Sequence, residues 1–80
     1  MNAYLATFHT HLAAMRTHRA LQAAGVAAQL APVPRTLSAS CGTCVRYQAE
    51  TPMETLLDSD FEKLVMQEPK GGYRLLSENA

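Results

Sequence analysis

The chain is 80 residues long, 48% of its residues are hydrophobic, and seven basic side chains balance seven acidic ones. This length predicts a single domain over residues 1–80 with a small core, since a chain of this size buries only about 60–65% of its unfolded surface. A homodimer would bury more. The net charge of zero excludes a general electrostatic field for nucleic acid or anionic lipid, so neither is an expected partner.

The N-terminus lacks the features of a signal peptide, because no basic region there is followed by an apolar run. No apolar stretch reaches the length that a membrane-spanning helix needs. Both observations predict a cytoplasmic protein. In that reducing compartment the two cysteines, Cys41 and Cys44, indicate redox, metal or sulfur chemistry more than a structural disulfide.

The N-terminal third predicts a strand, a helix and a second strand. Ala3–Phe8 is short, aromatic and apolar, which favours a strand. Thr10 is placed to cap a helix that begins at His11, and Gly25 stands where that helix would end. Val26–Ala31 then predicts a second strand, although its alanines are poor strand formers.

A proline-containing loop separates this strand from a third one. Pro32 and Pro34 end the second strand, because proline cannot donate a hydrogen bond to a neighbouring strand. Thr43–Gln48 then alternates in character, which is typical of a strand. The alternation predicts two faces, one carrying Thr43, Val45 and Tyr47 and the other carrying Cys44, Arg46 and Gln48.

The C-terminal third predicts a second helix and a fourth strand. Thr51-Pro52-Met53-Glu54 has the pattern of a capping box with proline at the first helical position. Apolar residues follow at helical spacing, namely Met53, Leu57, Phe61, Leu64 and Val65. Lys70-Gly71-Gly72 predicts a turn, and Tyr73–Leu76 a short last strand.

The order strand, helix, strand, strand, helix, strand predicts an α+β, ferredoxin-like βαββαβ sandwich. Two helices would cover one face of a four-stranded antiparallel sheet. In this topology Cys41 lies at the same end of the sheet as His9, His11 and the N-terminus of the first helix. We expect these groups, with Arg35 and Lys70, to favour the thiolate form of cysteine, which is its reactive form.

The loop also contains the most distinctive sequence of the chain. Pro32-Val33-Pro34-Arg35, followed by Leu37-Ser38-Ala39-Ser40-Cys41-Gly42, resembles a family of small bacterial domains described as selenium/sulfur carrier-like proteins. The likeness extends over nearly the whole chain. By this resemblance Cys41, next to Gly42, would carry sulfur or selenium. Ser40 could donate a hydrogen bond to the anionic adduct.

The resemblance and the loop cysteine together predict a sulfur or selenium carrier, rather than a stand-alone enzyme. A cysteine desulfurase or selenocysteine lyase would load Cys41 as a persulfide or its selenium counterpart. A downstream protein would accept the atom. No cofactor is expected beyond this covalent sulfur or selenium.

Other interpretations of the same residues remain open. Cys41 and Cys44 form a Cys-x-x-Cys pair, which also suits a thiol–disulfide redox module with Cys44 as the resolving thiol. Cys41, Cys44, His9 and His11 are a ligand set for zinc, although His-x-His on an extended segment directs the two rings to opposite sides. A binding or dimerisation module without cysteine chemistry is a further alternative.

Overall fold

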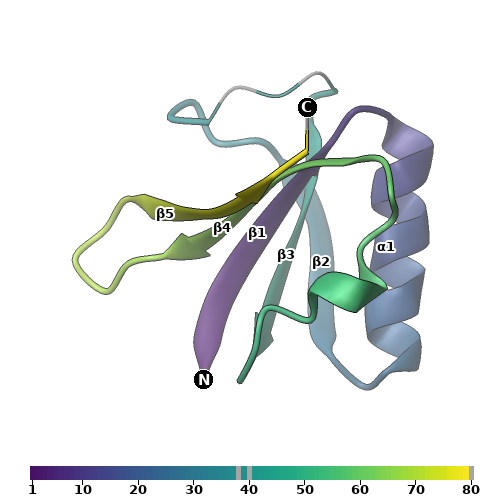
Figure 1. Ribbon diagram of the computed structural model, residues 1–80, viewed down its shortest axis with the longest axis horizontal. Coiled ribbons are helices and arrows are strands. Elements are labelled where there is room, and N and C mark those ends of the chain that lie inside the picture. The colour runs from purple at the N-terminus through teal and green to yellow at the C-terminus, as the bar shows by residue number, and fades with distance from the viewer. Residues whose placement is uncertain (38, 40, 80) are drawn as a thin grey trace.

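A five-stranded antiparallel sheet forms the centre of the fold, with one α-helix packed on one of its faces (Figure 1). The computed structural model describes residues 1–37, 39 and 41–79. In these residues the elements are, in order, β1 (Asn2–Phe8), α1 (His11–Ala23), β2 (Ala27–Pro32), β3 (Thr43–Ala49), the 3₁₀ turn η1 (Glu54–Leu56), β4 (Phe61–Gln67) and β5 (Tyr73–Glu78). The strands lie in the order β2-β3-β1-β4-β5. No helix in this part of the chain has the length and apolarity that crossing a membrane requires.

The first half of the chain folds as its sequence predicts. The hydroxyl oxygen of Thr10 accepts a hydrogen bond from the backbone N–H of Ala13 at 3.1 Å, which caps the start of α1. After the helix, Gly25 has a φ of 81°, a left-handed value that glycine adopts without steric cost. The ends of β1, β2 and β3 differ from the predicted ranges by no more than one residue.

The predicted ferredoxin-like sandwich of four strands and two helices is wrong in its second half. The described residues contain one α-helix and five strands. The expected capping box does not start a helix, because Met53 has a left-handed φ of 54° and only the short turn η1 follows. The Thr51 hydroxyl donates to the sulfur of Met53 at 3.3 Å instead of capping a backbone N–H.

Strand β4 occupies the residues where the second helix was predicted. Leu64 and Val65 point to opposite faces of the sheet, and both side chains are buried. A strand that is buried on both faces shows a continuous apolar run rather than polar–apolar alternation. Periodicity alone cannot distinguish such a run from part of a buried helix, which is why the spacing of Phe61, Leu64 and Val65 predicted a helix here.

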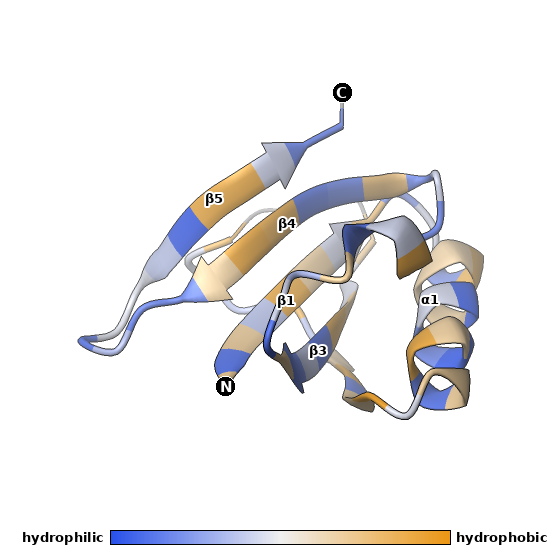
Figure 2. Ribbon diagram, turned by 60° about the horizontal axis from the view of Figure 1, so that its bottom comes forward, coloured by the Kyte–Doolittle hydropathy of each residue, from blue (hydrophilic) through white to orange (hydrophobic). Residues whose placement is uncertain are grey.

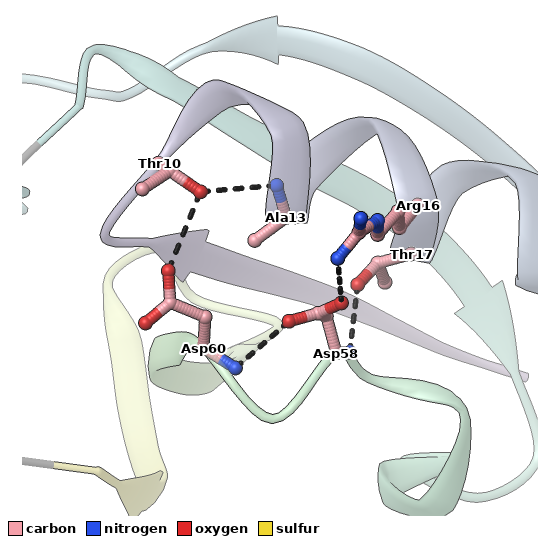
Figure 3. A network of polar contacts seen from close by, with 6 residues as sticks. All are labelled: Thr10, Ala13, Arg16, Thr17, Asp58 and Asp60. Atoms are coloured by element: carbon pink, nitrogen blue, oxygen red, sulfur yellow. Dashed lines mark hydrogen bonds and ion pairs between the residues drawn. The ribbon is translucent and has the colours of Figure 1, made fainter.

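The second helix was expected to begin in the segment between β3 and β4. Polar contacts hold this segment against α1 instead (Figure 3). The backbone N–H of Asp58 donates to the buried hydroxyl of Thr17 at 2.9 Å. Arg16 lies 3.9 Å from the Asp58 carboxylate, and the Thr10 hydroxyl donates to Asp60 at 3.3 Å. Side chains of α1 and of its N-cap residue Thr10 thus position the chain that leads into β4.

Apolar residues are buried on both faces of the sheet. In Figure 2 the hydrophobic residues appear in orange along α1, β1, β4 and β5. The main core lies on the α1 side and contains Tyr4, Ala6, Phe8, Ala13, Ala14, Leu21, Val45, Tyr47, Ala49 and Leu64. The second cluster lies on the opposite face and consists of Leu5, Cys44 and Val65. Val33 and Leu37, from the connection between β2 and β3, pack against this second cluster. The proline-containing loop therefore covers part of the face that the helix leaves open.

The turn between β4 and β5 lies at the opposite end of the sheet from the connection between β2 and β3 (Figure 1), which contains Cys41. Because β4 is antiparallel to β1, Met66 pairs with Tyr4 near the start of β1. Cys44 pairs with Thr7, near the end of β1. The predicted topology had placed Lys70 beside Cys41, and this prediction is wrong because the second helix was replaced by a strand of opposite direction.

Candidate functional site

Cys41 lies just before β3, at the end of the sheet where β1 finishes and α1 begins. Its side chain is half-buried and packs against the main core. The Cys41 thiol donates to the backbone carbonyl of Thr43 at 3.5 Å. The residue thus lies at the border between the core and the surface, and the hydrogen bond holds its thiol against the start of β3.

Gly42, next to Cys41, is exposed and leaves open space on its outer side. Beyond its two chain neighbours, a Cβ atom added at Gly42 would meet no atom of the described residues within 4 Å, and the φ of Gly42 does not lie in the left-handed region. Its carbonyl accepts a hydrogen bond from the backbone N–H of Val33 at 3.1 Å. Neither the backbone conformation nor packing within the described residues therefore requires glycine at this position.

The two histidines that were expected beside Cys41 face different neighbours. His11, the first residue of α1, has its Nδ1 atom 3.3 Å from the Thr43 hydroxyl. His9 has its Nε2 atom 3.3 Å from the backbone carbonyl of Asn79. The structure thus connects His11 to the Cys41 segment through Thr43, and it directs the ring of His9 towards the C-terminal residues.

Cys44 is in a different environment from Cys41. It is completely buried in the second cluster, and its thiol donates to the backbone carbonyl of Pro32 at 3.6 Å. Burial raises the pKa of the Cys44 thiol, while the nearby charge of Arg46 acts in the opposite direction with a smaller effect. The Cys44 sulfur is therefore held in its neutral form and away from solvent.

The described residues form neither a disulfide nor a metal cluster around Cys41. Both cysteines are free thiols, and they pack against clusters on opposite faces of the sheet. In the described part of the chain, no three His, Cys, Asp or Glu side chains come together as a metal site. Arg35 is exposed in a turn of the loop. Ser40 lies outside the described residues, as does Ser38.

Thr43 is the residue of this site that sequence reasoning missed. Its carbonyl accepts from the Cys41 thiol, and its hydroxyl contacts His11. The sequence identified Thr43 only as the start of a strand. Its role follows from the pairing of β3 with β1, which brings the first residue of β3 close to the start of α1.

Comparison with known proteins supplies the family. Residues 3–58 match the family described as "Putative Se/S carrier protein-like", a region that contains Cys41 and Gly42. The chain is also 38% identical over 45 residues to "Uncharacterized protein YtiA" of Escherichia coli. That alignment covers 56% of this chain and 53% of the relative, about half of its length. No solved structure matches the chain. Because the family match spans more than half of the residues, the chain belongs to the Se/S carrier-like family.

Proposed function

We propose that the protein carries sulfur or selenium on Cys41, as a persulfide or its selenium counterpart. Membership of the carrier-like family supports this role. The proposed donor is a cysteine desulfurase or a selenocysteine lyase, and the proposed acceptor is a downstream protein. The protein would then act as a carrier between two partners.

The contrast between the two sulfur atoms carries the proposal. Cys41 is half-buried and stands beside the exposed Gly42, where a Cβ atom would have no described residue within 4 Å other than its chain neighbours. Cys44 is completely buried, and burial raises its pKa. Only a thiolate that another protein can reach will accept sulfur from it. Of the two cysteines, Cys41 meets the requirement of access.

Loading on Cys41 would take place by sulfur transfer from a persulfide on the donor. The Cys41 thiolate attacks the outer sulfur of that persulfide, and the S–S bond of the donor breaks. The bonding electron pair leaves on the donor cysteine, which becomes a thiolate, so no external oxidant is needed. Before the attack the Cys41 thiol loses its proton and with it the hydrogen bond that it donates to Thr43.

The start of α1 would assist this step. The N-terminus of a helix carries partial positive charge, and the first turn of α1 contains no acidic residue. His11, at that terminus, contacts the Thr43 hydroxyl and would add positive charge when it is protonated. Asp60, which accepts a hydrogen bond from Thr10 at the same terminus, opposes this effect in part.

Intact-mass spectrometry after incubation with a cysteine desulfurase and cysteine tests the proposal. We expect the mass of one added sulfur atom on the wild type and on Cys44→Ala, and none on Cys41→Ser. Cys41→Ser is the matched control, because it replaces only the sulfur by oxygen. An unmodified wild type with an active desulfurase would contradict the carrier function. A loss of two hydrogen atoms without added sulfur would favour the thiol–disulfide alternative.

A further inference from the structure

A hollow of about 360 Å³ lies on the sheet face opposite α1, away from Cys41. Its floor includes Ala3 and Ala27, which pair with Gln48 on either side. The two alanines are short, so the longer side chains around them enclose an open space. The volume is at the lower end of the range for small-molecule sites, about 300–1,000 Å³.

The polar lining of the hollow comes from several strands. Gln29 lies on β2, Gln48 on β3 and Gln67 on β4, and all three are exposed. Each amide offers both hydrogen-bond donors and an acceptor. No aspartate or glutamate is among the lining residues that the structure describes. A ligand with an ammonium group would therefore find no opposite charge there, which argues against a free amino acid.

Arg46 supplies the positive charge of the hollow. It is exposed and pairs across the sheet with Leu5 on one side and Gln29 on the other. Within the described residues Arg46 has no carboxylate partner, whereas Arg16 lies near Asp58 and Arg74 pairs with a glutamate. Its guanidinium group thus remains available to bind the oxygens of a phosphate in a two-pronged geometry.

Tyr73, on β5, forms the wall of the hollow opposite β2 and β3. The residue is half-buried, packs against the second cluster and pairs with Gln67 across β4 and β5. Aromatic side chains on an open sheet face stack with nucleic-acid bases, and glutamine amides match the hydrogen-bonding edge of adenine. An arginine, three amides and one aromatic ring therefore match the phosphate, the base edge and the base plane of a nucleotide.

We propose that this hollow binds a nucleoside monophosphate, either free or as one unit of a single-stranded nucleic acid. The site depends on one local cation and on hydrogen bonds, so the net charge of zero does not oppose it. The proposal is independent of the carrier function, because neither Cys41 nor Thr43, which accepts its hydrogen bond, is among the residues that line the hollow.

Titration of the full chain with adenosine monophosphate, followed by amide NMR signals, tests this proposal. We expect saturable shifts at Ala3, Gln48 and Gln67. Arg46→Gln should weaken the binding by about tenfold or more, because hydrogen bonds to a charged group are lost. The matched control is Arg19→Gln, which removes an exposed arginine on α1 and should bind as the wild type does. Thermal unfolding followed by circular dichroism checks that both variants are folded.

Binding of adenosine, inorganic phosphate and a single-stranded oligoadenylate distinguishes a free nucleotide from a nucleic acid and from a site for phosphate alone. Adenosine and inorganic phosphate should each bind more weakly than adenosine monophosphate, and Tyr73→Leu should weaken binding of adenosine. If a single-stranded oligoadenylate binds more tightly than the mononucleotide, the natural ligand is a nucleic acid; equal affinity indicates a free nucleotide. The proposal is overturned by the absence of saturable shifts, by shifts confined to other parts of the chain, by equal binding of phosphate alone, or by unchanged binding in Arg46→Gln.

Discussion

Only two residues separate Cys41 from Cys44 in the chain, yet the two side chains pack on opposite faces of the sheet. Cys41 contacts the main core on the α1 side, and Cys44 is buried in the second cluster beneath Val33 and Leu37. Strand β3 starts between the two cysteines, at Thr43, and successive residues of a strand point to opposite faces of the sheet. The same short motif thus contains one partly exposed cysteine and one buried cysteine.

Alkylation should distinguish the two thiols. In the native protein iodoacetamide should modify Cys41 first, because Cys44 has no exposed surface and becomes accessible only when the structure opens. Peptide mass spectrometry at increasing reaction times measures the two rates separately. In denaturant both thiols should react at similar rates. Equal rates in the native protein would contradict the assignment of Cys44 to a closed cluster.

The raised pKa of Cys44 predicts a loss of stability at alkaline pH. In the unfolded chain the thiol ionises near its ordinary pKa of about 8.5, whereas in the folded protein burial raises that pKa. The stabilising contribution is therefore complete below this pH and is lost as the pH rises towards the folded-state pKa. Urea unfolding of the wild type should show a falling free energy of unfolding between about pH 8 and pH 10.

Cys44→Ala should remove most of this alkaline fall, while Cys41→Ala, in which Cys44 is still present, should keep it. Cys44→Ala also leaves a small cavity and should cost about 1 kcal/mol at neutral pH. The measurements belong below about pH 10, since burial also raises the pKa of Tyr47, whose ionisation would add a second effect above that range. A pH profile that is identical in Cys44→Ala and in the wild type would disprove the explanation.

Gly42→Ala should leave the fold intact and slow the loading of Cys41. Apart from its chain neighbours, the added methyl group meets no atom of the described residues within 4 Å, so the free energy of unfolding should change by no more than about 0.5 kcal/mol. In a complex with the donor, the same methyl group would lie beside the reacting sulfur. Gly25→Ala is the comparison, because its φ of 81° should make that substitution destabilising by about 1 kcal/mol. Normal loading of Gly42→Ala would show that the donor does not approach from this side.

Thr17→Val should destabilise the protein through the loss of a single hydrogen bond. The Thr17 hydroxyl is buried and accepts from the backbone N–H of Asp58, and valine has the same shape without the acceptor. We expect a loss of about 1–2 kcal/mol, measured by urea unfolding. Thr55→Val, at an exposed position of η1, should have little effect. Equal stability of the two variants would mean that this contact does not hold the segment before β4.

The sequence pattern predicted the first half of the fold because local signals and tertiary structure agree there. The Thr10 cap, the left-handed Gly25 and the alternation of Thr43–Gln48 all specify what forms. In the second half they conflict. The hydroxyl of Tyr47 donates to the carbonyl of Pro52, and Met53 packs against the main core, so tertiary contacts override a strong local helix signal.

The candidate site was predicted only in part for the same reason. Cys41 and His11 were placed correctly at one end of the sheet, because β1, α1 and β3 form as expected. Lys70 was misplaced, since its position depended on the direction of the missing helix. The closed environment of Cys44 requires the loop to fold over the sheet, and no pattern in the sequence indicates that contact.

Fragmentation mass spectrometry of the desulfurase-treated protein is the most direct test of the carrier proposal, because it locates the added atom. After trapping of persulfides with an alkylating reagent, the peptide that contains both cysteines is sequenced. The extra sulfur should lie on Cys41, and Cys44 should remain an unmodified thiol. Extra sulfur on Cys44, or a peptide without extra sulfur although the desulfurase has turned over, would contradict the proposal.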